Sequence, residues 1–258
     1  MIDLAKATAP SAGLDYTVRL ARGDAEIAAA QRLRYAVFVE ELGGDGALVD
    51  QEARIARARS DPFLDDLLLE TREGEVIRVY RLLREEAAAR AGQFYSEDEY
   101  DLAPLRASGR RLLELGRSCL HRDHRGGGAL FALWQGLADY VHDHAIEILF
   151  GVASFHGTDA ARLAEPLSLL HHRHLAPESL RVRAREMQSM DLVAEEALDR
   201  RAAMLQVPPL IRSYLRMGGF VGEGAFVDHA FNTTDVCLVM DTARLDPAAS
   251  ARYTRGRP

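Results

Sequence analysis

The residue types that most clearly point to chemistry lie between Leu112 and Trp134, in the segment LLELGRSCLHRDHRGGGALFALW. An apolar, strand-like run is followed by the turn Arg125-Gly126-Gly127-Gly128, and apolar residues then recur at helical spacing. The first turn of a helix presents unpaired N–H groups and a partial positive charge. Glycines in front of it let a ligand approach the backbone closely. The segment therefore predicts an anion site, most simply for a phosphate or pyrophosphate.

Two charged residues, Glu114 and Arg117, stand inside the apolar strand that leads to this turn. Side chains alternate along a strand, so residues three apart point to opposite faces unless a bulge intervenes. A structural ion pair between them therefore requires a bulge.

The amino-acid composition limits the classes of protein to which this chain can belong. The 258 residues are 48% hydrophobic and 28% charged, which is typical of a globular protein that buries a full core. The formal net charge of −7 argues against bulk binding to nucleic acid or to an anionic membrane surface. Lys6 is the only lysine, so arginine guanidinium groups supply nearly every cationic contact.

The two cysteines, Cys119 and Cys237, both lie in apolar strand-like runs. We interpret them as buried thiols in a reducing compartment rather than as a disulfide framework. No apolar run reaches the ~20 residues that span a bilayer, and the N-terminus lacks the pattern of a secretory signal. We therefore expect a cytoplasmic protein.

The remaining elements surround the central segment. We expect strands at 16–20, 67–70, 76–83 and 146–152, and a closing antiparallel pair at 220–227 and 236–240. Helices are expected from Asp24 to about 41, from the glycine turn to about 144, from 158 or 159 to 170, and from 210 to 217. Residues 43–62 read as a loop, residues 85–105 as a surface excursion, and 193–205 as an amphipathic helix. This order predicts an α/β fold with a sheet of mixed direction.

No linker rich in Pro, Gly or Ser divides the chain, so we expect flexible tails at 1–14 and 246–258 around a single domain at 15–245. The domain is expected to contain an insertion at about 157–207. Its apolar positions could line a channel for a long acyl chain or form ordinary core.

The glycine turn resembles the signature of the GNAT superfamily of N-acyltransferases, an Arg or Gln, two residues, Gly, one residue, then Gly or Ala. The match runs through Gly128, and Leu130 departs from the small residue expected there. Residues 214–220 (YLRMGGF) resemble the later helix-to-strand segment of the same superfamily. The resemblance implies a GNAT-like acyltransferase fold, a mixed central sheet flanked by helices, here with a helical insertion before the last strands.

One branch is more similar still, the ornithine Nα-acyltransferases. Separated segments resemble it in order: LRYAVFVEELG (33–43), VYRLL (79–83), ELGRSC (114–119), LWQG (133–136), ASFHGTD (153–159), PPLIRSYLR (208–216) and NTTDV (232–236). The chain departs at Asp65-Asp66-Leu67, where a Cys–acid–His–Leu pattern is expected, and at Ile77-Arg78-Val79, where a glycine-containing strand is expected.

The resemblance implies transfer of a 3-hydroxyacyl group from acyl carrier protein to the α-amine of L-ornithine, which gives lyso-ornithine lipid. The partners would be acyl carrier protein and ornithine, with no nucleic acid. No cofactor would be tightly bound, since the donor is an acyl-phosphopantetheine thioester on carrier protein or on coenzyme A. The donor-binding residues would be Leu120, His121, Arg125, Gly126, Gly127, Gly128 and Ala129. Because the product is a lipid, peripheral contact with the inner membrane face is an alternative that the composition does not require.

The catalytic residues would be Glu114 and Arg117. Glu114 could take the proton of the ornithine ammonium as general base, bind that ammonium, or form a structural ion pair. Arg117 could bind the α-carboxylate of the acceptor or form a structural bridge. Cys119 could carry the acyl group covalently, but no histidine is fixed beside it by a motif, so we favour direct transfer.

Other basic residues have weaker interpretations. His171, His172 and His174 match no strong metal signature, and we predict no metal site. The basic stretch from Arg173 to Arg185 could dock an acidic carrier protein, with Arg32 and Arg34 as the alternative. The rival functions are a related acyltransferase that uses another amine, such as an acyl-homoserine-lactone synthase-like enzyme, and a module that binds acyl thioesters without catalysis.

Overall fold

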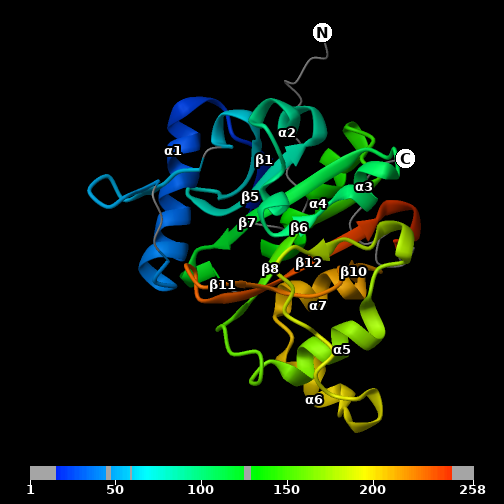
Figure 1. Ribbon diagram of the computed structural model, residues 1–258. Coiled ribbons are helices and arrows are strands. Elements are labelled where there is room, and N and C mark those ends of the chain that lie inside the picture. The colour runs from blue at the N-terminus through cyan, green and yellow to red at the C-terminus, as the bar shows by residue number, and fades with distance from the viewer. Residues whose placement is uncertain (1–15, 45–47, 59, 125–128, 246–258) are drawn as a thin grey trace. The chain divides into compact units, whose positions relative to one another are not determined.

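The computed structural model describes residues 16–44, 48–58, 60–124 and 129–245 (Figure 1). Helices and strands alternate through these ranges and divide into two compact units. The first unit holds residues up to 82 together with 116–144, and the second holds 83–115 and the residues from 145 on. The number of domains stays a prediction.

The first unit begins with a strand and a helix and continues through two hairpins. Its elements are β1 (Tyr16–Leu20), α1 (Gly23–Arg34), a π-helical turn (Tyr35–Glu41), β2 (Val49–Asp50), β3 (Ile55–Ala56), a 3-10 turn (Asp61–Phe63), β4 (Asp65–Thr71), most of β5 (Val76–Arg84), the second part of β7 (Leu112–Leu120), a 3-10 turn (Arg122–His124) and α4 (Ala129–Asp143). β1, β4 and β5 form an antiparallel meander, and β7 is the next strand beside β5.

Helices pack on both faces of these strands. On one face Leu68 and Val79, which are opposite each other in the β4–β5 register, join Leu33 and Val37 of α1 and its π-helical extension in a buried cluster. The other face is covered by α4, which approaches the strands closely at Gly136. A Cβ there would lie 2.2 Å from Val18 Cγ1, so the glycine is needed for the contact.

The second unit is built on the first part of β7 and on two long strands. Its elements are α2 (Glu85–Ala91), a 3-10 turn (Tyr95–Asp98), β6 (Tyr100–Asp101), α3 (Ala103–Ala107), β8 (Ile148–His156), α5 (Ala164–His174), a 3-10 turn (Glu178–Leu180), β9 (Arg183–Ala184), a 3-10 turn (Glu195–Ala197), α6 (Arg200–Gln206), α7 (Pro209–Arg216), β10 (Phe220–Val221), β11 (Phe226–Asp228), β12 (Thr233–Asp241) and a 3-10 turn (Thr242–Arg244).

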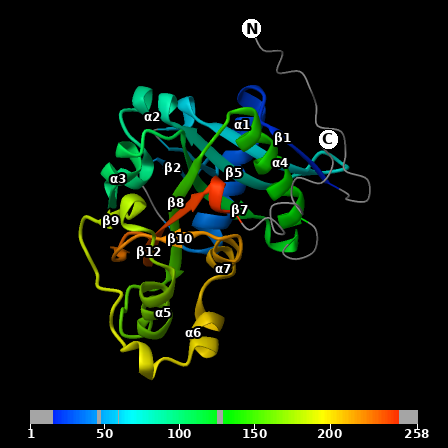
Figure 2. The same cartoon turned by 90° about the vertical axis from the view of Figure 1, so that its right-hand side faces the viewer.

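In this unit the central strands are β8 and β12, which pair antiparallel along their whole length. β7 joins β8 in parallel from Leu112 to Glu114, and β10 and β11 both pair antiparallel with β12. The parallel pairing ends where a Cβ on Gly151 would lie 2.1 Å from the Leu115 carbonyl oxygen, so a glycine lets the two backbones approach at this point. Helices α5 and α6 pack beside each other (Figure 2). The expected mixed sheet, the flanking helices and the closing antiparallel pair are confirmed.

Two segments differ from expectation. Residues 43–62 contain the β2–β3 hairpin and the Asp61–Phe63 turn, so their interpretation as a loop throughout was wrong. Residues 85–105 form helices and a bridge strand, and Phe94 and Tyr100 are fully buried, so the interpretation as a surface excursion was wrong. In the segment 85–105 the buried residues are spaced irregularly, so no amphipathic period marks it.

The predicted helix boundaries also shift. Asp24 lies in the first turn of α1 and is not its N-cap, and α5 starts at Ala164 because Asp159 caps a separate turn at Ala161. The predicted helix at 193–205 shortens to α6, whose true cap is Asp199. The apolar positions of the insertion fall into two groups. Leu167 and Leu170 are buried in the core, whereas other positions, such as Met187, are exposed.

Both cysteines are buried free thiols, as predicted. None of the helices in the described ranges is long and apolar enough to cross a membrane.

A partly buried ion pair fixes the end of β12 to the residues before β7. Arg110 donates hydrogen bonds to the Asp241 carboxylate and to the Glu147 carbonyl oxygen. The Arg110 hydrogen bond lowers the pKa of Asp241, and a second bond from the Ala243 N–H adds to this effect. A carboxyl group whose folded pKa lies below its unfolded value of about 4 stabilises the fold above that pH, and the contribution is lost as the pH falls through the folded value.

We therefore expect Arg110→Gln to lower the free energy of unfolding at pH 7 by about 1 kcal/mol and to flatten the loss of stability below about pH 4. Scanning calorimetry between pH 3 and 7 measures both effects. Arg244→Gln is the matched control, because Arg244 is exposed and its Nε lies 3.9 Å from the Asp241 carboxylate. An equal effect from both substitutions would contradict the assignment.

Candidate active site

The predicted catalytic residues both lie on β7, as expected. Glu114 is in the part that belongs to the second unit, and Arg117 is in the part that belongs to the first. Arg117 has a left-handed backbone, with φ +48°. A left-handed residue inside a strand is typical of a bulge, which redirects the side chains that follow. The simple rule that residues three apart face opposite sides therefore does not hold across Arg117.

Glu114 is buried, and its carboxylate is held by the turn that begins at Tyr95. Oε2 accepts from the Tyr95 N–H at 2.8 Å, and Oε1 accepts from the Ser96 N–H at 2.6 Å and from Ser96 Oγ at 2.5 Å. These donors fill three of about four lone-pair positions of a carboxylate. The arrangement is that of an anion bound at the start of a 3-10 turn.

Arg117 lies among different neighbours in the first unit. Its guanidinium carbon is 5.7 Å from the centre of the Phe38 ring, which is a cation–π contact. The next residue, Ser118, accepts a hydrogen bond from Arg78 of β5 at 3.2 Å. The alternatives of carboxylate ligand and structural bridge both remain proposals for Arg117.

Three of the predicted donor-binding residues are described, and they lie at the end of β7 and the start of α4. Leu120 ends β7, the His121 N–H donates to the Ile77 carbonyl oxygen at 2.8 Å, and Ala129 opens α4 with no exposed surface. Arg125, Gly126, Gly127 and Gly128 lie outside the described residues. The sequence thus located the strand and the helix correctly, and the donor-binding role of these residues stays a prediction.

Sequence reasoning missed a cluster of buried charges between α1, β4 and β5, which we call the arginine–aspartate cluster: Arg34, Asp61, Asp66 and Arg81. Asp61 accepts from Arg34 Nη2 at 3.0 Å and lies 3.2 Å from Arg81 Nη2, while Asp66 lies 3.4 Å from Arg34 Nη1. Burial, more than the neighbouring Arg34, lowers the pKa of Arg81 to about 10. Burial also raises the pKa of Asp66 against the opposing effect of Arg34.

The same cluster corrects one expectation about the carrier protein. Arg34 was an alternative docking cation, but its side chain is 2% exposed and fully engaged with Asp61 and Asp66. It cannot meet a partner at the surface. Arg32 is exposed. Arg173 and Arg183 of the basic stretch are also exposed, and they pair with Glu195 and Glu223. Docking of a carrier protein at these side chains stays a prediction.

Cys119 offers little as a nucleophile. Its side chain is buried, and burial raises the pKa of its thiol to about 12. A thiolate, not a thiol, attacks a thioester, and this environment disfavours the thiolate. The geometry supports the expectation of direct transfer over a covalent acyl-cysteine.

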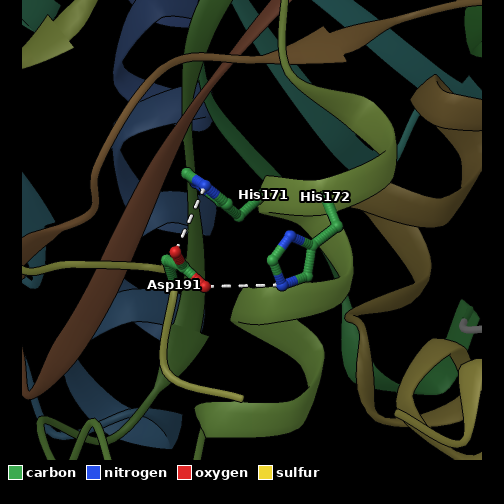
Figure 3. Close-up of side chains that lie close together, drawn as sticks. All are labelled: His171, His172 and Asp191. Atoms are coloured by element: carbon green, nitrogen blue, oxygen red, sulfur yellow. Dashed lines mark ion pairs between the residues drawn. The ribbon is translucent and has the colours of Figure 1, made fainter. Parts of the chain in front are cut away.

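Two histidines of α5 approach an aspartate in the second unit (Figure 3). His172 Nε2 lies 3.4 Å from Asp191 Oδ1, and His171 Nε2 lies 4.0 Å from Asp191 Oδ2. Such a group could hold a metal ion. However, His172 Nε2 is also 2.9 Å from the Val193 carbonyl oxygen, a contact that requires a proton on this nitrogen. We interpret the group as a tie between α5 and the 191–193 segment, and the prediction of no metal is retained.

The class of protein follows from the fold and from a family comparison. Residues 33–135 match the family model described as "Acetyltransferase (GNAT) domain". Among solved structures, an N-acyl amino acid synthase from uncultured soil microbes has a similar fold, with a TM-score of 0.52 at 12% identity over 88% of this chain and 90% of the other. The mixed sheet, its flanking helices and the strand–turn–helix at β7 and α4 are those of a GNAT-type acyltransferase.

Curated relatives narrow the class. The chain is 62% identical to an L-ornithine N(alpha)-acyltransferase of Rhodobacter capsulatus, over 95% of this chain and 97% of the relative. It is 41% identical to the protein of that name from Brucella abortus, over 92% of this chain and 86% of the relative. The chain belongs to the L-ornithine N(alpha)-acyltransferase family.

Proposed function

We propose that this chain acylates the α-amine of L-ornithine with a 3-hydroxyacyl group carried as a thioester on acyl carrier protein, and so forms lyso-ornithine lipid. The observation that carries the proposal is the 62% identity, over nearly the full length of both chains, to a relative named for acyl transfer to ornithine. The donor and the lipid product are the finer part of the proposal, and they rest on the ordered sequence segments described above.

The reaction places four demands on the site. The ornithine ammonium must lose a proton, the amine must attack the thioester carbon, the oxyanion of the tetrahedral intermediate must be stabilised, and the departing thiolate must be protonated. A C–N bond forms and the C–S bond breaks. The α-nitrogen gives up two protons: the first leaves the ammonium before attack and passes to solvent, and the second leaves the tetrahedral intermediate and balances the proton gained by the thiolate. The buried, protonated thiol of Cys119 supports attack by the amine itself.

Glu114 is proposed to act first as a positioning residue for the Tyr95–Ser96 turn. Its three hydrogen bonds support this role, because each of those donors would lose a strong acceptor without it. A base role would have to compete with these three donors for the carboxylate oxygens. Arg117 is proposed as a ligand of the acceptor carboxylate, because a guanidinium can bind both oxygens of a carboxylate and this one lies over the Phe38 ring on the strand that carries Glu114.

The proposal is tested with the purified chain, 3-hydroxyacyl carrier protein of several chain lengths, and one acceptor at a time. We expect a product of the mass of Nα-(3-hydroxyacyl)ornithine by liquid chromatography and mass spectrometry, with lysine, glutamine, glycine and S-adenosylmethionine at least about tenfold slower in kcat/KM. Preference for another acceptor would replace ornithine in the proposal. Donor binding without turnover of any amine would favour a non-catalytic module.

A further inference from the structure

Arg78 is a buried cation of the first unit that the proposed reaction has not used. It lies in the interior of β5 and is 7% exposed. Its Nη2 donates to Ser118 Oγ at 3.2 Å, and its Nε is buried without a hydrogen-bond partner. A neutral hydroxyl does not compensate a buried guanidinium.

The other buried charges nearby do not compensate Arg78 either. Arg34 and Arg81 share the carboxylates of Asp61 and Asp66, and within the described ranges no carboxylate lies within ion-pair distance of Arg78. Burial is the largest influence on the pKa of Arg78, and it lowers that pKa. The groups that oppose this shift, Tyr80 and Cys119, are both neutral at pH 7. The surplus positive charge in this region is therefore that of Arg78.

The position of Arg78 in the sheet indicates where its partner would lie. The Asp65 carboxylate accepts from Tyr140 of α4, and Leu67, two residues further along β4, meets the same helix at Gly136. Two strand residues span about the same length as four helix residues, roughly 6 to 7 Å. Two more residues along β4 lead to Leu69, which is the cross-strand partner of Arg78. The corresponding step of four residues along α4, from Gly136, leads to about residue 132. Arg78 is thus level with the first turn of α4, whose N–H groups also favour an anion.

We propose that Arg78, with the Ser118 hydroxyl, forms a buried position for a substrate oxyanion beside the first turn of α4. The proposal deepens the proposed function and rests on it for the identity of the substrates. Both substrates of the proposed reaction carry an oxyanion: the acceptor has a carboxylate, and the pantetheine arm of the donor has a phosphate. Both are recognised by guanidinium hydrogen bonds.

The first test measures binding of inorganic phosphate, and of acetate as a carboxylate probe, by the shift in Tm at constant ionic strength. Wild type is expected to gain stability with one of the two anions, whereas Arg78→Met is expected to lose that response. Arg84→Met is the matched control, because Arg84 ends the same strand, is partly exposed and already pairs with Glu86. It should keep the wild-type response, and Arg78→Lys, which keeps a charge, should keep part of it.

Steady-state kinetics then identify the source of the oxyanion. A rise of about tenfold or more in KM for the acyl donor alone assigns the phosphate, and the same rise for ornithine alone assigns the carboxylate. Without ligand, Arg78→Met should be at least as stable as wild type, since it removes an uncompensated buried charge.

Three results would overturn the proposal: an unchanged anion response in Arg78→Met, both KM values within twofold of wild type, or a variant that fails to fold. The last result would make the guanidinium a structural group. If wild type acylates no amine at all, the proposed function fails, and the anion titration still decides the role of Arg78.

Discussion

Asp61→Asn is expected to lower the free energy of unfolding by about 3–5 kcal/mol, the cost of breaking a buried ion pair from one side. Asp61 contacts both guanidinium groups of the arginine–aspartate cluster, and it also accepts from the Gln31 side chain and the Ala58 N–H. An asparagine in the same place carries no charge and turns an N–H group toward donors. Arg34 and Arg81 would then have to share Asp66 as their nearest anion.

For a chain of this length the loss corresponds to a fall in Tm of about 6–20 °C, measurable by calorimetry or by denaturant titration. Asp50→Asn is the control within the same unit. Asp50 pairs with Arg57 at 3.9 Å, and the side chains are 36% and 55% exposed, so this ion pair should contribute less than about 1 kcal/mol. A loss below about 1 kcal/mol in Asp61→Asn would show that the cluster does not hold α1 to β4 and β5.

The cluster also shows where prediction from sequence stops. Asp66 and Arg81 are directly opposite each other in the β4–β5 register, but that register depends on where the turn at Gly74 closes the hairpin. Arg34 comes from a helix, and Asp61 comes from a short 3-10 turn in a segment without periodic pattern. Charges inside apolar strands were a signal that something must compensate them, but the partners are fixed only by tertiary packing.

The strand β7 and the helix α4 could be predicted because their pattern does not depend on tertiary packing. The pattern is local: an apolar run of strand length, a glycine turn, and then apolar residues at helical spacing. Glu114 was identified because it is a charge in that run. Its partners, the Tyr95 and Ser96 N–H groups and the Ser96 hydroxyl, lie in a segment whose composition indicated surface. The sequence therefore identified the residue and its element, but not its surroundings.

Glu114→Gln is the second substitution for which we expect a large effect. A glutamine has one acceptor oxygen, so at least one of the three donors at Tyr95 and Ser96 would face an NH2 group in a buried site. We expect a loss of about 2–3 kcal/mol in the free energy of unfolding, or a fall in Tm of about 4–12 °C. Ser96→Ala removes the hydroxyl donor alone and should cost about 1 kcal/mol, so the two variants together measure how strongly the turn depends on the carboxylate.

Kinetics separate this positioning role from general-base catalysis. If Glu114 only holds the turn, its substitution lowers kcat/KM because the Tyr95–Ser96 segment becomes less ordered, and Ser96→Ala shows part of the same loss. The acid limb of the pH–rate profile then keeps its position in both variants. A base instead contributes about 10²–10⁴-fold to kcat, and its removal abolishes that limb while Ser96→Ala leaves kcat nearly unchanged. We expect the first pattern, because three donors already bind the carboxylate and compete with a proton from the ammonium for its oxygens. Loss of the limb in Glu114→Gln, with a normal Tm, would return the proton-transfer role to this residue.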